Sequence, residues 1–189
     1  MLIFTLYPKL TIYAQYGFLT LLEDEAFFKE KLKSDPNNPD LHFNLATCYS
    51  LMGNYAQALS EYKQTVFLKP DDSVALRELG NLYRMQSNKL RLAELNLKKS
   101  IAINPKDSIA WQELAFIQSD LCRSAEAIES LQASLKLNNS IENSSFSLFY
   151  IGVLQLNLRK KDEALKTAEQ LEKFNSDLAS QLREMAAMN

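Results

Sequence analysis

The stretch that decides the fold is residues 42–70, which read HFNLATCYSLMGNYAQALSEYKQTVFLKP. Leu45, Ala46 and Tyr49 lie at positions i, i+1 and i+4, which form one face of a helix. A second helix follows, with the small Ala58 near the point where the two helices cross most closely. Pro70 ends that helix, because proline supplies no amide hydrogen and clashes with the preceding turn. The stretch therefore predicts a helical hairpin.

The same pattern returns three more times along the chain. Leu45-Ala46 is followed by the equivalent pairs Leu79-Gly80, Leu114-Ala115 and Ile151-Gly152. The small residues of the second helices are Ala58, Ala93, Ala127 and Ala164, at separations of 35, 34 and 37 residues. Periods of this length indicate repeated supersecondary units. Because one hairpin cannot bury its apolar face alone, neighbouring hairpins must stack to make the core.

These segments resemble tetratricopeptide repeats, whose pattern is W-x2-L-G-x2-Y, then A-x3-F, then P, over 34 residues, and the resemblance covers about three quarters of the chain. It implies an all-α fold, a right-handed α-solenoid of helix-turn-helix hairpins whose first helices line a concave groove where ligands bind. We expect repeats at 39–72, 73–107, 108–141 and 145–175. Residues 1–38 then form an N-terminal helical segment, either a degenerate leading repeat or an anchor, and 176–189 a C-terminal capping helix.

Local signals predict where the helices begin and end. Asn38 before Pro39, and the aspartates at Asp71-Asp72 and Asp107, place capping oxygens at helix starts. Ser144-Ser145 is expected to do the same for the fourth repeat. Pro70 and Pro105 should follow the ends of second helices.

Composition narrows the function. The chain has 189 residues, 47% hydrophobic and 23% charged, which is typical of a globular protein, and its formal charge of −2 gives no reason to expect a nucleic-acid partner. Four glycines and five prolines are too few for a β-sandwich or for a glycine-rich phosphate loop. No nucleophile, base and orienting group can be proposed together. We therefore expect no catalytic residue, no metal site, no cofactor and no enzyme activity.

The single histidine and the two cysteines are expected to be structural. His42 takes the core position that Trp111 occupies two repeats later. Cys48 takes a small buried helical position, and Cys122 falls at a turn. Lying two repeats apart, the cysteines should be too distant for a disulfide, which fits a reducing compartment.

The expected groove residues come from the first helices of the repeats. They are Phe43, Asn44, Arg77, Asn81, Arg84, Glu113, Phe116, Phe146, Phe149 and Tyr150. The helix of the fourth repeat is apolar nearly all round, so something should cover it. The covering is either the capping helix with neighbouring second helices, or an apolar partner segment held by Phe116, Phe149 and Tyr150, or a second copy of the chain.

Arg77, Asn81 and Arg84 share one helix face, spaced at i, i+4 and i+7. They could meet a partner's carboxylate or phosphate, or the arginines could pair with Glu78, Glu113 or Asp120. A subgroup of tetratricopeptide domains clamps a chaperone's C-terminal carboxylate with Lys, Asn and Arg. Here Glu113 stands where that clamp needs Asn, and Phe146 and Tyr150 where it needs Lys and Arg, so we do not expect the clamp.

The first 22 residues are apolar, with Lys9 as their only charge. Their uninterrupted stretch, 10–22, has 13 residues, fewer than the roughly 20 that span a bilayer, which favours a packed helix over a membrane anchor.

Together these features predict a non-enzymatic, cytoplasmic adaptor that binds a peptide or helix of a partner protein in the groove. The alternatives are a membrane-attached assembly factor anchored through residues 1–22 and a regulatory subunit of an enzyme complex. Homo-oligomers are possible.

Overall fold

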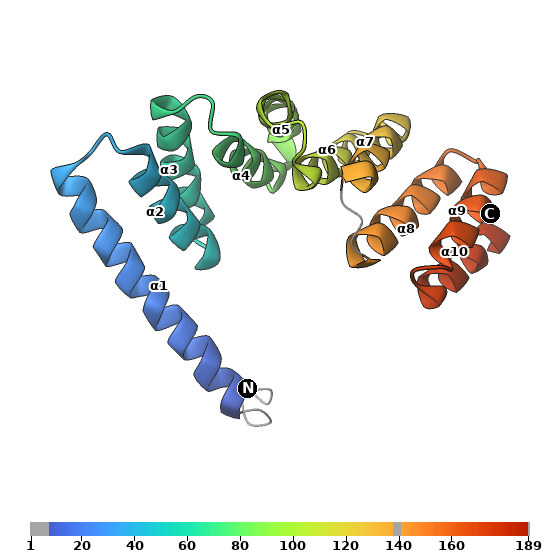
Figure 1. Ribbon diagram of the computed structural model, residues 1–189, viewed down its shortest axis with the longest axis horizontal. Coiled ribbons are helices and arrows are strands. Elements are labelled where there is room, and N and C mark those ends of the chain that lie inside the picture. The colour runs from blue at the N-terminus through green and yellow to red at the C-terminus, as the bar shows by residue number, and fades with distance from the viewer. Residues whose placement is uncertain (1–7, 138–140, 189) are drawn as a thin grey trace. The chain divides into compact units, whose positions relative to one another are not determined.

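The computed structural model describes residues 8–137 and 141–188, and side chains within 20–137 and 144–188 except that of residue 87. All regular structure in these ranges is helical (Figure 1), so the predicted all-α class is confirmed. The elements are α1 (Pro8–Ser34), α2 (Pro39–Leu51), α3 (Tyr55–Leu68), α4 (Ser73–Arg84), the 3-10 turn η1 (Ser87–Lys89), α5 (Leu90–Ile103), α6 (Ser108–Asp120), α7 (Ser124–Leu137), α8 (Ile141–Asn157), α9 (Lys161–Leu171) and α10 (Ser176–Met188).

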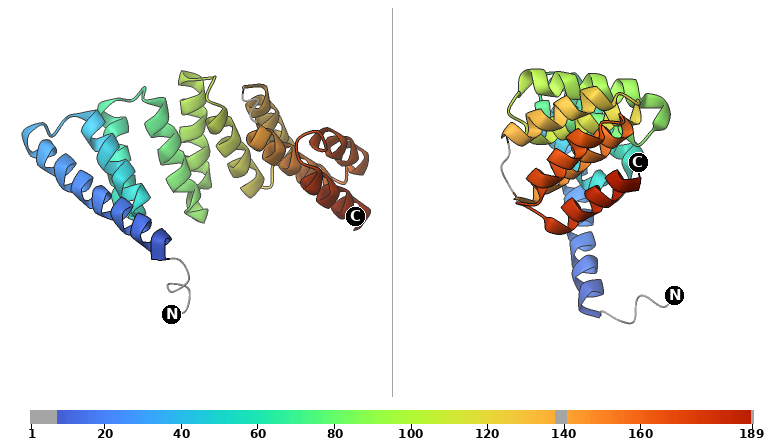
Figure 2. Two further views of the ribbon diagram at one scale, coloured as in Figure 1. Left: turned by 60° about the horizontal axis from the view of Figure 1, so that its bottom comes forward. Right: turned by 90° about the vertical axis from the view of Figure 1, so that its right-hand side faces the viewer.

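The helices belong to two compact units, residues 1–82 and 83–189, whose boundary falls inside α4. In the first unit α1 packs on α2, and α2 on α3. In the second unit each helix from α5 to α10 packs on the next, and α10 also contacts α8. Figure 2 shows α8, α9 and α10 grouped in brown to red at the C-terminal end.

Each hairpin closes around a fully buried small residue. Ala58, Ala93, Ala127 and Ala164 all have 0% of their surface exposed, as the repeat pattern predicts. A larger side chain at these positions would push the paired helices apart, because protein interiors are close-packed.

Most helix ends follow the local signals. The Asn38 side-chain oxygen accepts hydrogen bonds from the first-turn amides of α2 at 3.1 and 3.2 Å. The Asp107 carboxylate caps α6 at 3.0 and 3.1 Å, and that of Asp72 accepts from an amide of α4 at 3.0 Å. Helices α3 and α5 end two residues before Pro70 and Pro105, because proline cannot continue a helix.

The predicted helix cap at Ser144-Ser145 was wrong. Ser144 and Ser145 do not cap a helix; they lie inside α8, which begins at Ile141. Together with Ser147 they are at most 6% exposed. Their small side chains are used for packing, and this use depends on tertiary neighbours that a capping pattern does not reveal.

The N-terminal segment contains one long helix. Pro8 does not interrupt it but is its first residue, a position where proline's missing amide costs nothing. Residues 1–7 of the predicted anchor lie outside the described range. No helix in the described part of the chain is both long enough and apolar enough to cross a bilayer.

Three turns between paired helices share a left-handed residue. Gly53, Cys122 and Arg159 have φ angles of 77°, 59° and 58°. Each donates its amide to the carbonyl three residues back, and the next amide bonds the carbonyl five residues back, which is the Schellman helix ending. Glycine suits this conformation, whereas Cys122 and Arg159 adopt it against the preference of their side chains.

The two cysteines differ sharply in environment. Cys48 is 5% exposed on α2, and burial raises the pKa of its thiol. Cys122 is exposed at its turn, and both thiols are free. The predicted placements of Cys48 and Cys122 are therefore confirmed.

The C-terminal helix packs closely on α8. A Cβ atom at Gly152 would clash with Leu182 Cδ2 and lie 3.1 Å from its Cγ, and Leu182 is fully buried. Helix α10 buries Leu182 with Ala179 and Ala186 beside it, while Met185 is 38% exposed. The smallest residue of α8 therefore lies where α10 approaches it.

We predict that Gly152→Ala lowers the free energy of unfolding by about 1 kcal/mol. Alanine gains about 1 kcal/mol in helix propensity over glycine, but overpacking costs about 1–3 kcal/mol. In a Leu182→Ala background the clash is gone, so the same substitution should stabilise the protein. Urea unfolding of both single variants and the double variant measures this. A destabilisation by Gly152→Ala that is equally large in both backgrounds would contradict the close packing.

A charged network ties α5 to the turn before α7. Glu94 lies 2.6 Å from Arg123 and 2.7 Å from Lys98, and Arg123 also reaches Glu126 at 3.3 Å. Burial raises the pKa of Glu94, but hydrogen bonding to the Arg123 and Lys98 cations outweighs burial, and the pKa lies below the ordinary 4.5. Glu94 is therefore held in its charged form.

The lowered pKa of Glu94 gives a pH-dependent stability. The ionised Glu94 carboxylate contributes fully to the free energy of unfolding at any pH above the pKa that it has in the unfolded chain. This contribution is lost as the pH falls through the lower pKa that Glu94 has in the folded protein. We predict that Glu94→Gln lowers the unfolding free energy at neutral pH by about 1 kcal/mol, and that the difference from wild type shrinks below about pH 4. Urea titrations across this range measure it. The exposed Glu169→Gln is the control and should match wild type; a difference for Glu94→Gln that grows on acidification would contradict the assignment.

Candidate protein-binding surface

Three aromatic rings from two helices of the second unit form a cluster. The centroid of Phe116 on α6 lies 5.9 Å from that of Phe146 and 5.4 Å from that of Tyr150, both on α8, in edge-to-face arrangements. Phe146 and Tyr150 are stacked at 6.2 Å. Phe146 is 46% exposed, so the cluster presents apolar surface to solvent.

A charged pair lies against the same cluster. The Arg84 guanidinium, at the last residue of α4, lies 5.0 Å from the centre of the Phe116 ring, within cation–π range. Its Nε donates to Asp120 Oδ2 at 2.8 Å. The Tyr150 hydroxyl donates to Ser119 Oγ at 2.9 Å. We call Arg84, Phe116, Phe146 and Tyr150, with their partners Ser119 and Asp120, the aromatic–arginine surface.

Helical spacing explains how these side chains meet. Phe146 and Tyr150 are four residues apart on α8, as are Phe116 and Asp120 on α6, so each pair shares a face. Phe149, one turn after Phe146, packs instead against the buried cluster that α8 forms with α9 and α10. Helices α9 and α10 therefore cover one part of the apolar surface of α8, and the part around Phe146 is exposed to solvent.

The remaining predicted groove residues have different surroundings. In the first unit, Phe43 packs edge-to-face on Tyr62 at 5.5 Å and, with the exposed Asn44, lines a pocket of about 380 Å³. Arg77 donates to Glu78 at 3.0 Å, and Asn81 is half-buried on α4. In the second unit, Glu113 is half-buried on α6.

The two arginines of the predicted cation face are both paired. Arg77 pairs with Glu78 and Arg84 with Asp120, which is the pairing that the sequence left open as an alternative to partner binding. Sequence reasoning missed Ser119 as a partner of Tyr150. The available signal was its position one turn after Phe116, on the side of α6 that faces α8.

Sequence models agree with the repeat pattern. A model described as tetratricopeptide repeat matches residues 25–80, and a second model of the same description matches residues 146–174. The chain is a tetratricopeptide repeat protein. No curated protein matches its sequence.

Solved tetratricopeptide repeat structures share the solenoid fold. A MamA crystal structure superposes with a TM-score of 0.73 at 22% identity, covering 82% of this chain and 83% of that one. MamA from Desulfovibrio magneticus RS-1 gives 0.74 at 17% identity, covering 89% and 93%. YrrB, described as a repeat protein with an unusual peptide-binding site, gives 0.69 at 18% identity, covering 84% and 90%. At these identities the likeness establishes the fold.

We predict a small, salt-sensitive coupling between Arg84 and Asp120. Both side chains are more than a third exposed, and exposed pairs contribute about 0.2–1 kcal/mol. A double-mutant cycle with Arg84→Ala and Asp120→Ala, followed by urea unfolding, should give about 0.5 kcal/mol at low salt and less at about 1 M salt, where the Debye length is about 3 Å. Coupling that is zero at low salt would show that the pair contributes nothing in solution.

Proposed function

We propose that this tetratricopeptide repeat protein is a non-enzymatic scaffold that binds a segment of a partner protein at the aromatic–arginine surface. The observation that carries the proposal is the half-exposed ring of Phe146, held by Phe116 and Tyr150 rather than left loose. Rigid aromatic side chains supply large contact area at low entropic cost, and together with arginine they dominate protein interfaces.

The charges at this surface favour an apolar contact. The Arg84 cation is already matched by Asp120 at 2.8 Å, so an acidic group on a partner would have to compete with that carboxylate. The exposed carbon surface of Phe146 has no such competitor. The partner segment therefore presents an aliphatic or aromatic side chain to the rings, and its binding depends only weakly on salt.

The wider groove proposal includes the first-unit residues Phe43, Asn44, Arg77 and Asn81. The pocket beside Phe43 and Asn44 supports a separate contact region within the first unit. Phe149 is withdrawn from the binding set, because it packs against the α9–α10 cluster.

A phage-displayed random peptide library, selected on the wild-type protein, tests the proposal. Phe146→Ala should reduce the affinity of selected peptides about tenfold, which corresponds to about 1.4 kcal/mol. Phe174→Ala is the matched control, because Phe174 is 41% exposed in the turn before α10. Its affinities should stay within about twofold of wild type.

Selected peptides should also carry an aliphatic or aromatic residue whose replacement abolishes binding. Both variants should remain folded; Phe146→Ala should lower the urea midpoint only modestly, because it loses two ring contacts at a half-exposed position. Peptides that bind Phe146→Ala as tightly as wild type would move the binding surface elsewhere.

A further inference from the structure

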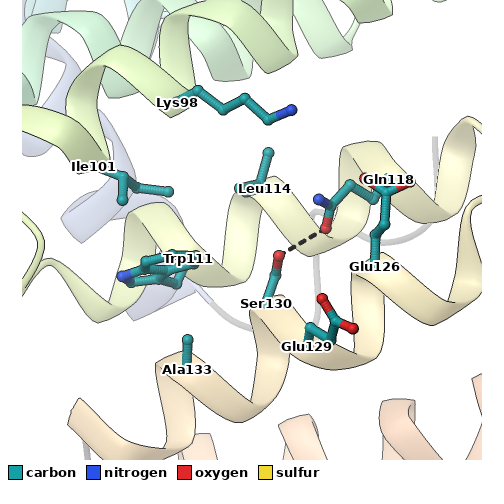
Figure 3. A pocket seen from close by; sticks show the side chains of 9 residues that line it. All are labelled: Lys98, Ile101, Trp111, Leu114, Gln118, Glu126, Glu129, Ser130 and Ala133. Atoms are coloured by element: carbon teal, nitrogen blue, oxygen red, sulfur yellow. Dashed lines mark hydrogen bonds between the residues drawn. The ribbon is translucent and has the colours of Figure 1, made fainter.

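A second concave site lies in the second unit among α5, α6 and α7. It is a pocket of about 430 Å³, within the usual range for ligand sites, and none of its lining residues belongs to the aromatic–arginine surface. Figure 3 shows Trp111 and Leu114 from α6, Ile101 and Lys98 from α5, and Glu129 from α7 around it.

The floor of this pocket is apolar. The Trp111 indole donates its only N–H to the Pro105 carbonyl at 3.0 Å, so the ring offers its carbon face to the pocket. The His42 ring makes the same kind of contact, since its Nε2 lies 3.0 Å from the carbonyl oxygen of Pro36, six residues earlier. Two polar residues that also line the pocket satisfy each other, since the Ser130 hydroxyl donates to Gln118 Oε1 at 2.7 Å, drawn as the dashed line in Figure 3.

The rim carries one unbalanced negative charge. Lys98 forms an ion pair with Glu94, and Glu126 forms one with Arg123. Glu129 is exposed, and no ion pair involves it among the residues that the structure describes. Figure 3 shows its carboxylate turned from α7 toward the pocket. The rim therefore attracts a single cation.

The next repeat provides an internal comparison. Its equivalent pocket, 37 residues on, keeps the buried hydrogen bond, since Thr167 donates to Gln155 at 2.8 Å. However, Leu148 stands in place of Trp111 and Lys166 in place of Glu129, and the pocket is smaller, about 260 Å³. The two repeats thus share the Gln–hydroxyl bond but not the indole or the carboxylate, which belong to the pocket of Trp111 and Glu129.

We propose that the pocket of Trp111 and Glu129 binds an alkylguanidinium group, such as an arginine side chain of a partner peptide. The methylene stem lies against Trp111 and Leu114, and the planar cation stacks on the indole and donates to the Glu129 carboxylate. Tryptophan is the best cation–π ring, and guanidinium suits both stacking and paired donation to a carboxylate. This site is separate from the proposed function and does not depend on it.

Trp111 reports on the site directly, because it is the only tryptophan in the chain. The probes are the peptide acetyl-Gly-Arg-Gly-amide, its citrulline analogue, which is neutral but has the same shape, and agmatine as a free alkylguanidinium. The arginine peptide should change tryptophan fluorescence saturably, with a dissociation constant of about 1 mM or below. The citrulline peptide should bind at least about fivefold more weakly. If the arginine peptide binds more tightly than agmatine, the natural ligand is an arginine side chain of a peptide. If agmatine binds more tightly, the natural ligand is a small alkylguanidinium molecule.

Variants of the rim complete the test. Glu129→Gln should weaken binding about three- to tenfold, and Glu129→Lys, which copies the next repeat, should abolish it. Lys166→Gln is the matched control in the equivalent pocket and should bind like wild type. The proposal is overturned by the absence of a saturable change, by equal binding of the citrulline peptide, or by Glu129→Gln binding as tightly as Lys166→Gln.

Discussion

The close approach of paired helices is the constraint on which the rest of this structure depends. Ala58, Ala93, Ala127 and Ala164 have no exposed surface, so no atom can be added there without separating a hairpin. The same requirement appears between α8 and α10, where Gly152 makes room for Leu182. Because the packing surfaces are set by small residues, the side chains on the remaining helix faces are free to vary from repeat to repeat.

That freedom explains why the two candidate sites are local. The aromatic–arginine surface depends on Phe116, Phe146 and Tyr150, and the α5–α7 pocket on Trp111 and Glu129, at positions whose repeat equivalents carry other chemistry. The shared hydrogen bonds from Ser130 to Gln118 and from Thr167 to Gln155 keep the backbone framework the same beneath these differences. Specific binding chemistry can therefore be added without altering how the hairpins stack.

Much of this organisation could be predicted from the sequence, because its causes are local. Asn38 and Asp107 cap helices through amides two and three residues away, and Pro70 and Pro105 act on the turn before them. The start of α8 could not be predicted in this way. Ser144 and Ser145 have the composition of a cap, but their burial is decided by packing partners distant in the sequence. The repeat register indicated Phe116 and Tyr150 as groove residues, but their ring contact and the packing of Phe149 against the α9–α10 cluster depend on neighbours distant in the sequence. The Trp111 pocket was missed because that residue was interpreted only as core.

The left-handed turn before α7 has a practical consequence. The turn places the Cys122 thiol in solvent, while the other thiol, Cys48, is enclosed and made less acidic by burial. Cys122 is therefore the one exposed thiol of the two, and the Schellman ending of α6 fixes its backbone conformation. A maleimide dye, spin label or surface tether would attach there without mutagenesis, giving single-site immobilisation in a defined orientation.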